Sequence, residues 1–407
     1  MDSILDPRMA AYRKGYSCEY VLLNLTEQWK KALDTKMHTG AIFMDLSKAF
    51  DCLSHPLTIA KLRTYGLSQE SCALVWSYLS ERRQRVKLSG QTSEWKYLKK
   101  GVPQGSILGP SLFNVFMNDL FSTIKKASLH NYADDNSISA SASTITEVMN
   151  ILTEESNLAI QWFKCNMMEA NASKFQALVL NCNEPCVFSI DNQEIVTDAS
   201  VKLLGVYLDS KLNFHHQVST LCKKAGAQLR VLKRLSSHLD TASRLQIFRS
   251  FILSHFTYCC LVWHFCGSVH AKKLEKIQFR ALKFVFCDFT SSYDVLLDKA
   301  GLTTLELFRL RQILIFVYKC VNELSPPFLW NMFGKRTTSY NFRNANQLSR
   351  TTSRTVKNGI KSMTDYGCKL WNEVSDSIKN EKTLKDFKKR IDKWSPKGYQ
   401  SKDCTNL

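Results

Sequence analysis

The pattern of apolar and polar positions divides the chain into a mixed first half and a mainly helical second half. Residues 41–44 form an unbroken apolar run, which predicts a strand buried on both faces. Residues 112–116 are also mostly apolar and follow a Gly- and Pro-rich segment, so we expect a buried helix there. Two short segments, 127–131 and 136–140, flank a polar tetrapeptide and are expected to form the strands of a hairpin.

Helical spacing dominates the later part of the chain. Residues 221–235 place apolar side chains at helical intervals, with most of the basic side chains on the other positions. Residues 302–324 form a long apolar-rich stretch that ends at Ser325-Pro326-Pro327, and a closing helix is expected over 384–394. Near the start of the chain, Leu22, Leu25 and Trp29 predict a further helix.

Three acidic residues stand where carboxylates are costly. Asp134 and Asp135 are adjacent at the tip of the expected hairpin, and like charges at this distance resist joint ionisation. Asp45 directly follows the buried strand, where an acid is unfavourable unless something cationic receives it. A divalent cation such as Mg²⁺, which prefers hard oxygen ligands, would relieve the repulsion. Taken alone, the Asp-Asp pair has a simpler alternative, an ordinary solvated turn.

A shaped loop lies between these acids in the sequence. Residues 101–110 contain three glycines and two prolines. Gly105 allows the backbone to approach a ligand closely, because it has no Cβ. The loop therefore joins the acids as a candidate part of one site.

These segments, in this order and spacing, resemble the motifs of a reverse transcriptase of a non-LTR (LINE-type) retrotransposon. Phe43–Asp51 is similar to motif A, Gly101–Ser106 to motif B, and Tyr132–Asp135 to motif C. Two further segments extend the likeness. Asn171–Lys174, with Trp162 and Asn166-Met167 before it, resembles motif D, and Lys202–Asp209 resembles the primer-grip motif E.

The resemblance implies an α+β fold, the right-hand polymerase with a palm of antiparallel sheet and helices, a helical thumb and a mostly helical C-terminal region. The domains expected from it are a remnant of the fingers at 1–39, the palm at 40–200 with a helical, fingers-like insertion at about 56–100, the primer grip and thumb at 201–290, and a C-terminal helical region of unknown role at 291–407. The polar residues from 341 to 354 are expected to form a loop or linker.

The activity implied is RNA-directed DNA polymerisation, in which a DNA primer is extended on an RNA template by two-metal nucleotidyl transfer. Asp45 and Asp134 are expected to bind two Mg²⁺ ions, with Asp135 completing the cluster, the backbone carbonyl of Leu46 as a further ligand, and Mn²⁺ as a substitute metal. Lys174 is the candidate for protonating the leaving pyrophosphate. The alternative for Lys174 is an ordinary exposed lysine at the end of a turn.

The deoxynucleoside triphosphate is expected to contact four residues, namely Phe50, Gln104, Gly105 and Tyr132. Phe50 occupies the position at which the family excludes a ribose 2′-hydroxyl. Its alternative role is that of a core phenylalanine at the start of a helix. Gln104 and Gly105 are expected to lie against the nascent base pair and its sugar.

Composition agrees with a polyanionic partner. The chain has 407 residues, 55 Lys and Arg against 36 Asp and Glu, and a formal charge of +19, although many proteins without such a partner are also basic. Phosphates of the RNA template and DNA primer are the expected partners of the basic residues. The candidate nucleic-acid contacts are Arg82, Arg83 and Arg85, then Lys223, Arg230 and Arg234, and Leu204 and Gly205 of the primer grip.

Fourteen cysteines are scattered along the chain, and the first residues lack the pattern of a secretory signal. We therefore expect reduced thiols in an intracellular protein. The cluster from Cys259 to His270 contains candidate zinc ligands, but its spacing is not that of a zinc finger and its neighbours are apolar, which favours a buried thumb helix. No apolar run reaches the ~20 residues of a membrane-spanning helix, so a soluble protein without a membrane partner is expected.

The sequence also departs from complete enzymes of the family. It begins almost at motif A, so the fingers strands and an endonuclease domain are missing from it, and an N-terminally truncated copy is expected. The alternative function is a catalytically inactive, nucleic-acid-binding remnant of such an element. An RNA-dependent RNA polymerase shares the paired-acid hairpin, but Phe50 and Pro103-Gln104-Gly105 argue against it.

Overall fold

The computed structural model describes residues 4–182, 184–335, 347–350 and 352–399. The chain forms two compact units, one made of Met1–Val21 with Met37–Asp198 and the other of Leu22–Lys36 with Ala199–Leu407. The division falls within helix α1 (Cys18–Asp34). The helix predicted from Leu22, Leu25 and Trp29 is confirmed, and all three side chains are buried.

The first unit is built on a four-stranded antiparallel sheet, which confirms the α+β class. Its strand order is β6 (Ser128–Tyr132), β7 (Asp135–Ala142), β1 (His38–Met44), β8 (Gln176–Leu180). The run predicted to be a buried strand is β1, which lies between β7 and β8 and is buried from Thr39 onward. A strand paired on both sides has no free edge, so its end is a fixed place for the residue that follows.

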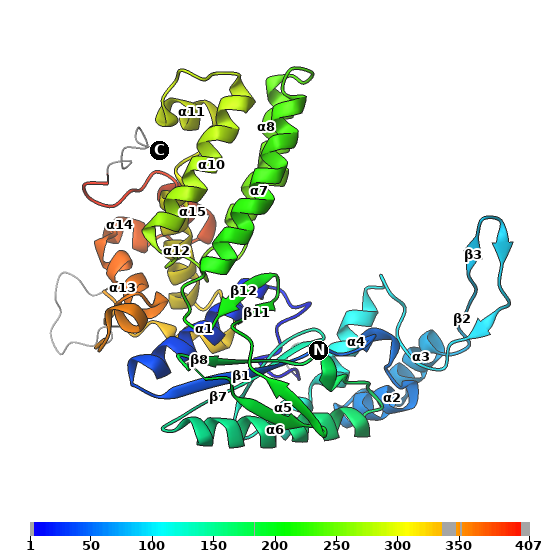
Figure 1. Cartoon of the computed structure of the whole chain (residues 1–407). Coiled ribbons are helices and arrows are strands. Elements are labelled where there is room, and N and C mark those ends of the chain that lie inside the picture. The colour runs from blue at the N-terminus through cyan, green and yellow to red at the C-terminus, as the bar shows by residue number, and fades with distance from the viewer. Residues whose placement is uncertain (1–3, 183, 336–346, 351, 400–407) are drawn as a thin grey trace. The chain divides into compact units, whose positions relative to one another are not determined.

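Helix α6 (Ile145–Cys165) covers one face of this sheet (Figure 1). Its start is capped by Thr144, whose side chain accepts a hydrogen bond from the backbone N–H of Glu147. Gly40 permits close packing, because a Cβ at this position would lie 3.1 Å from Leu152 Cδ1 and 3.3 Å from Val148 Cγ1. The sheet and helix therefore meet at short range below the centre of β1.

The buried helix predicted near residue 112 is confirmed as α4 (Leu108–Met117). Its Leu112, Phe113 and Phe116 side chains are fully buried in the core of the first unit. Helix α2 (His55–Thr64) packs against α4 and against α3 (Gln69–Leu79). The remaining elements of this unit are α5 (Leu120–Thr123), η1 (Ala49–Asp51), η2 (Ala172–Lys174), β9 (Val187–Ile190) and β10 (Gln193–Val196).

The insertion predicted to be helical at 56–100 is helical only in its first half. After α3 the chain forms a long hairpin with nearly every side chain exposed, which extends away from α2 and α3 (Figure 1). Ser89 and Gly90 both have positive φ, 48° and 82°, as a two-residue hairpin turn requires. The Ser-Gly pair was the signal for this turn. The strands are β2 (Arg83–Gln84), β3 (Lys87–Leu88), β4 (Gln91–Thr92) and β5 (Lys96–Tyr97).

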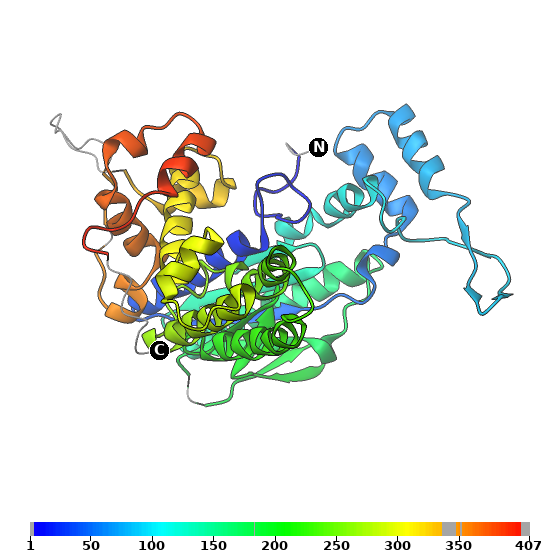
Figure 2. The same cartoon turned by 90° about the horizontal axis from the view of Figure 1, so that it is seen from above.

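Besides the larger part of α1, the second unit contains a short hairpin that starts at Ser200 and is followed by helices. Helices α7 and α10 lie side by side, as both views show (Figures 1 and 2). The helix predicted over residues 221–235 is confirmed as part of α7. The elements are β11 (Ser200–Leu203), β12 (Val206–Asp209), α7 (His215–Leu235), α8 (Thr241–Ile247), the π-helical η3 (Phe248–Leu253), α9 (Ser254–Thr257) and α10 (Ser268–Phe286).

The cysteine-rich segment that was predicted to be a buried helix is buried but not helical. Cys259, Cys260 and Cys266 are buried in a series of turns between α9 and α10. Cys259 has a φ of 48°, which interrupts a helix. All the cysteines in the described ranges are free thiols, including Cys182 and Cys186, whose Sγ atoms lie 3.9 Å apart.

The long apolar stretch near the end of the chain is confirmed as helix α12 (Leu305–Val321), which is buried along most of its length. Phe387 stacks on Tyr318 with ring centroids 4.1 Å apart, so the predicted closing helix packs on α12. Half of the predicted loop at 341–354 lies outside the described residues. The other elements are α11 (Tyr293–Ala300), η4 (Pro327–Met332), η5 (Val356–Ile360), α13 (Met363–Glu373), α14 (Asp376–Lys379) and α15 (Leu384–Ile391).

Within the part of the chain that the structure describes, each helix is too short or too polar to cross a membrane.

Candidate active site

The tetrapeptide Tyr132–Asp135 closes the hairpin between β6 and β7. Tyr132 pairs with Asp135, so Ala133 and Asp134 form a two-residue turn, and Ala133 has a φ of 56°. The prediction that both acids lie at the tip of the hairpin is wrong for Asp135, which is the first residue of β7 and is half-buried. Of the two acids, only Asp134 lies in the turn.

Two asparagines that the sequence analysis missed hold this turn. Asn131 Nδ2 donates hydrogen bonds to the Ala133 carbonyl at 2.7 Å and to Asn136 Oδ1 at 2.9 Å. Asn136 Nδ2 in turn donates to the Asp134 carbonyl at 3.1 Å. Both asparagines are buried, so these bonds satisfy turn carbonyls that a hydrophobic neighbour would leave unpaired. The sequence feature that could have indicated this role is their position on either side of the tetrapeptide.

Asp45 lies at the same end of the sheet as the turn. Met44 pairs with Asn136 across β1 and β7, which puts the next residue, Asp45, beside the end of β7 where Asp135 begins. Burial, and then the charges of Asp134 and Asp45, raise the pKa of Asp135 to about 6. Burial and the charge of Asp134 also raise the pKa of Tyr12. The register and the electrostatics therefore bring the three predicted acids together.

The three acids do not form a closed ligand set by themselves. Within the described ranges, no group of three or more His, Cys, Asp or Glu side chains is gathered closely enough to hold a metal ion. The donor chemistry nevertheless fits a hard cation, since these are carboxylates, and burial together with their mutual repulsion raises the pKa of Asp135. Mg²⁺ in particular is usually held by one or two carboxylates together with substrate phosphates and water.

Leu46 and Lys174 lie at the same sheet end. Leu46 is buried and forms an isolated antiparallel bridge with Ala170. Lys174 ends η2 and is exposed, two residues before Gln176, which pairs with Phe43 of β1. The roles assigned to Leu46 as a metal ligand and to Lys174 as a proton donor stay predictions.

Phe50 is half-buried, with one face packed on the core. Its ring stacks on Phe113 at 4.3 Å and meets the edge of Tyr12 at 6.0 Å. This stacking is the packing expected of the alternative role, a core phenylalanine. Because Tyr12 also lies within the field of Asp134, Phe50 and the acids share a neighbour. Phe50 and the half-buried Tyr132 stay predicted contacts of the nucleotide.

The Gly- and Pro-rich loop is held against η1. Gly101 has a φ of 84°, and a Cβ there would lie 2.8 Å from the Asp51 backbone, so only glycine fits. Gln104 Nε2 donates to Asp51 Oδ1 at 3.0 Å. Gly105 has a φ of 77° and faces open space, as close approach of a ligand requires. The loop lines a cavity of about 830 Å³ that includes Gln104 and Arg82.

The three predicted arginines of the hairpin differ in their surroundings. Arg82 donates to the Gly101 carbonyl at 2.6 Å and to the Leu79 carbonyl at 3.2 Å, so it anchors the base of the hairpin to the loop. The guanidinium groups of Arg83 and Arg85 lie over the ring of Trp95, at 5.1 and 4.6 Å, and both side chains are exposed. The nucleic-acid contacts assigned to these three arginines stay predictions.

The predicted primer-grip residues form the β11–β12 turn in the second unit. Leu204 and Gly205 have φ values of 45° and 81°. Tyr258, a residue that the sequence analysis missed, donates from its hydroxyl to the Leu204 carbonyl at 2.8 Å. A Cβ on Gly205 would lie 3.3 Å from Tyr258 Cε1, so the ring supports the turn directly. A contact across 54 positions leaves no signal in the sequence.

Helix α7 presents the predicted basic face. Lys223, Arg230 and Arg234 are exposed, whereas Leu221 and Leu232 are buried. A cavity of about 610 Å³ lies between α7 and α10, and its lining is mainly basic and aromatic. The lining includes Arg230, Lys233, Arg280, Lys283, Phe284 and Phe289.

Residues 2–208 match the family described as "Reverse transcriptase (RNA-dependent DNA polymerase)". The match covers half of the chain and includes the acids, the loop and the β11–β12 turn. The protein belongs to the reverse transcriptase family, whose members use divalent metal ions.

Several similar proteins are named for mobile elements, which confirms the resemblance to non-LTR retrotransposons. A "Probable RNA-directed DNA polymerase from transposon BS" of Drosophila melanogaster is 27% identical over 302 residues, covering 69% of this chain and 33% of the relative. The "RNA-directed DNA polymerase from mobile element jockey" of Drosophila funebris is 25% identical over 265 residues, covering 62% and 29%. The chain thus spans about a third of the length of these relatives.

Among solved structures, telomerase from Candida tropicalis is 12% identical, with a TM-score of 0.40 over 77% of this chain and 57% of that chain. This similarity is too low to support an argument about fold or function.

Proposed function

We propose that this chain is an RNA-directed DNA polymerase that adds deoxynucleotides to a DNA primer paired with an RNA template. The observation that carries the proposal is the meeting of Asp45, Asp134 and Asp135 at one end of the sheet, where their charges act on one another. Crowded carboxylates of this kind are unfavourable without a cation. The family of the chain and the names of its relatives support the same activity.

The metal site would use Asp45, Asp134 and Asp135, with the carbonyl of Leu46 as a further ligand. Two Mg²⁺ ions, or Mn²⁺ in their place, would supply neutralisation of the triphosphate charge. Phe50, Gln104, Gly105 and Tyr132 would enclose the deoxynucleoside triphosphate, and Lys174 would give a proton to the leaving pyrophosphate. The protein itself then contributes position, charge and the exclusion of a ribose hydroxyl.

The primer–template is held by separate groups. The Leu204-Gly205 turn would position the primer end. The exposed cations Lys223, Arg230 and Arg234 would contact phosphates, as would Arg83 and Arg85, with Arg82 supporting them from the base of the hairpin. Phosphate contacts of this kind hold a duplex without reading its sequence.

The direct test is extension of oligo(dT) on poly(rA) with Mg²⁺ or Mn²⁺. We expect extension by the full chain and a loss on the order of 10³-fold in Asp134→Asn, the size of effect seen when one electrostatic contact to a transition state is removed. Retention of extension by Asp134→Asn would contradict the assignment of the site.

Binding is tested separately from chemistry. Replacing Lys223, Arg230 and Arg234 together by Gln should lower the salt slope of hybrid binding by roughly two to three units, about one per lost phosphate contact. The matched control replaces Lys382, Lys385 and Lys388, three exposed lysines around α15, by Gln and changes the net charge equally. Binding with the expected slope but without extension would instead indicate the nucleic-acid-binding remnant.

A further inference from the structure

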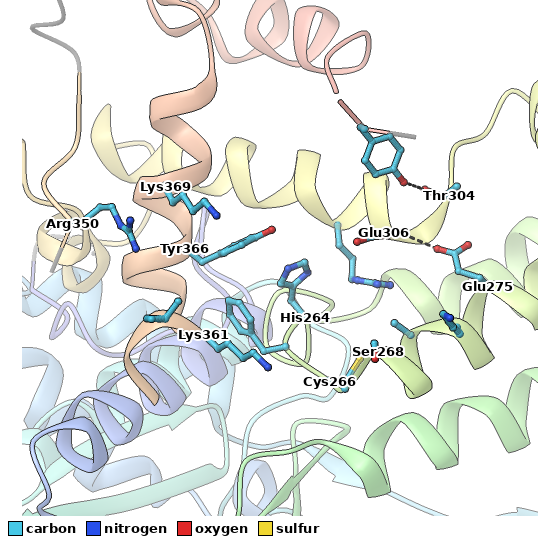
Figure 3. A pocket seen from close by; sticks show the side chains of 17 residues that line it. His264, Cys266, Ser268, Glu275, Thr304, Glu306, Arg350, Lys361, Tyr366 and Lys369 are labelled. Atoms are coloured by element: carbon cyan, nitrogen blue, oxygen red, sulfur yellow. Dashed lines mark hydrogen bonds between the residues drawn. The ribbon is translucent and has the colours of Figure 1, made fainter. Parts of the chain in front are cut away.

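The second unit contains a cavity that has no part in the proposed polymerisation. Its volume is about 600 Å³, within the range of roughly 300–1,000 Å³ typical of small-molecule sites. The walls come from the turns before α10, from α10 and α12, and from the segment that includes η5 and α13 (Figure 3). The cavity therefore joins parts of the chain that are far apart in sequence.

A buried arginine lines this cavity with donors that no described residue satisfies. Arg309 of α12 is 2% exposed, and its Nε and Nη1 atoms are buried without a hydrogen-bond partner among the described residues. Its guanidinium lies over the ring of Trp263 at 5.5 Å. Leaving charged donors unpaired in the interior is costly, so the arrangement is favourable only when an acceptor enters the cavity.

The nearby carboxylate of Glu275 is already committed. Its Oε2 accepts from the Tyr293 hydroxyl at 2.6 Å, and its Oε1 accepts from the backbone N–H of Glu306 at 2.9 Å. Burial raises the pKa of Glu275, against the opposing effects of these hydrogen bonds and of the charge of Arg309. The charge of Arg309 acts on Glu275, but among the described residues no carboxylate accepts a hydrogen bond from its Nε or Nη1, so these donors are available to an anion.

The other charges around the cavity are mostly positive. Arg350 is bound to Asp365 by two hydrogen bonds, of 3.0 and 2.8 Å, whereas Lys361 and Lys369 are exposed at the same side of the cavity (Figure 3). The cationic lining residues are Lys272, Arg309, Arg350, Lys361 and Lys369, against two acids, Glu275 and Glu306. The excess favours an anionic ligand.

An aromatic wall adjoins these charges. The rings of His264, Phe265 and Tyr366 lie within 4.9 to 5.5 Å of one another, and the Tyr366 and His264 side chains point into the cavity (Figure 3). Burial, together with the charges of Arg309 and Lys30, lowers the pKa of His264 to about 3, so the imidazole is neutral. Its buried Nδ1 has no partner among the described residues. A ligand with a flat ring and polar groups at its edge would fit against these side chains.

We propose that this cavity binds one nucleotide unit, with its phosphate on Arg309 and its base against Tyr366 and His264. A simple inorganic anion would use the arginine but not the rings, and an apolar ligand would leave the arginine unpaired. Base stacking on aromatic side chains combined with cationic contacts is the usual means of holding a single-stranded nucleic acid. The site is independent of Asp134 and of polymerisation.

The test is photocrosslinking of an oligo(rU) that carries one 5-iodouridine to the full-length chain, with the crosslinked peptide identified by mass spectrometry. We expect crosslinks at His264 or Tyr366. Lys361→Ala with Lys369→Ala should weaken crosslinking about tenfold, and so should Tyr366→Leu. Because both lysines are exposed, their replacement does not endanger the fold. Arg309→Gln, checked by circular dichroism, should have the largest effect.

The controls separate this proposal from polymerisation. Lys385→Ala with Lys388→Ala removes equal charge from the same unit and should leave the crosslink unchanged, as should Asp134→Asn. If unlabelled oligo(rU) prevents the crosslink and UMP does not, the ligand of the site is a single strand. If UMP also prevents the crosslink, the ligand is a free nucleotide. Crosslinks that persist in the Tyr366 and lysine variants, or that map only elsewhere, would overturn the proposal even if extension succeeds.

Discussion

Two hairpin turns in different units share one strained backbone feature but have different supports. Ala133-Asp134 and Leu204-Gly205 are both two-residue turns, and each places a non-glycine residue at positive φ, 56° for Ala133 and 45° for Leu204. A left-handed conformation costs such a residue about 1–2 kcal/mol. Both turns therefore persist only because something else compensates.

The compensation is local in one turn and distant in the other. Asn131 and Asn136 belong to the strands that the first turn joins, so its support forms with the hairpin itself. Leu204 is held by Tyr258, which reaches it only when the turns before α10 are packed. The acid-bearing turn can thus keep its shape while other parts of the protein move, whereas the second turn reports on the folding of its unit.

The largest effect is expected from breaking the local support. Asn136→Ala removes the bond to the Asp134 carbonyl and leaves Asn131 without one acceptor, in a buried position. We expect a loss of about 2–3 kcal/mol in the free energy of unfolding, measured by urea denaturation, and a decrease in primer extension. Ser141→Ala is the control, because it removes a bond to Thr39 at the far end of the same strand. Equal losses of stability and of primer extension in both variants would contradict a particular role for Asn136 in supporting the turn.

A smaller effect is expected at the distant support. Gly205→Ala adds a Cβ 3.3 Å from Tyr258 in a backbone conformation with φ of 81°, which should cost about 1–2 kcal/mol. Tyr258→Phe removes only the hydroxyl bond to Leu204 and should cost about 0.5–1.5 kcal/mol. For both variants we expect KM for primer–template to rise more than kcat falls. A change in kcat alone would argue against a role in holding the primer.

The first turn also differs from the second in the acidic residues that lie beside it. The pKa of Asp135 is raised to about 6, above its ordinary value of 3.8, so the folded state holds the proton more tightly than the unfolded state. Stability therefore decreases as pH rises from about 4 to 6, and the ionised carboxylate destabilises the metal-free fold at higher pH. Asp135→Asn should stabilise the metal-free protein at pH 8 by about 1 kcal/mol, after allowance for solvent screening, and hardly at all at pH 3.5. Thermal unfolding in EDTA at both values measures this, and a loss of stability at pH 8 would contradict it.

The smallest effect is expected from relieving the backbone of the first turn. Ala133→Gly removes the steric cost of a positive φ but adds entropy to the unfolded chain. We expect a net stabilisation of a few tenths of a kcal/mol, roughly 0.5 at most. Chemical denaturation of the variant beside the parent is sufficient, and a clear destabilisation would show that the Ala133 methyl group has a packing role.

Sequence alone was sufficient where the determining contacts are local. The buried strand β1, the hairpin around the acids and the helices α4, α7 and α12 were predicted because apolar periodicity and turn residues act over a few positions. The convergence of Asp45 with Asp134 came from the family resemblance, since antiparallel pairing between β1 and β7 joins residues about 90 positions apart.

Other features depend on contacts that no local pattern records. The hairpin after α3 was missed because its charged residues resemble a basic helix, and only the Ser89-Gly90 pair indicated the turn. The segment around Cys259 is as apolar as a buried helix, but its side chains are buried in turns instead. The support of Leu204 by Tyr258, and the burial of Arg309 with two donor atoms that no described residue satisfies, appear only when distant segments are brought together.

The exposed hairpin from Arg83 to Tyr97 has a practical consequence. Its short strands pair only with each other, and a two-stranded ribbon without a hydrophobic core is marginally stable in water. Trypsin should therefore cleave first at Arg85 or Lys87, leaving the second unit uncut and the sheet of the first unit folded. The guanidinium groups of Arg83 and Arg85 lie over Trp95 in this hairpin. A duplex bound to these arginines would shield the peptide bonds after Arg85 and Lys87 from trypsin. The rate of the first cut would therefore measure the fraction of protein that has duplex bound.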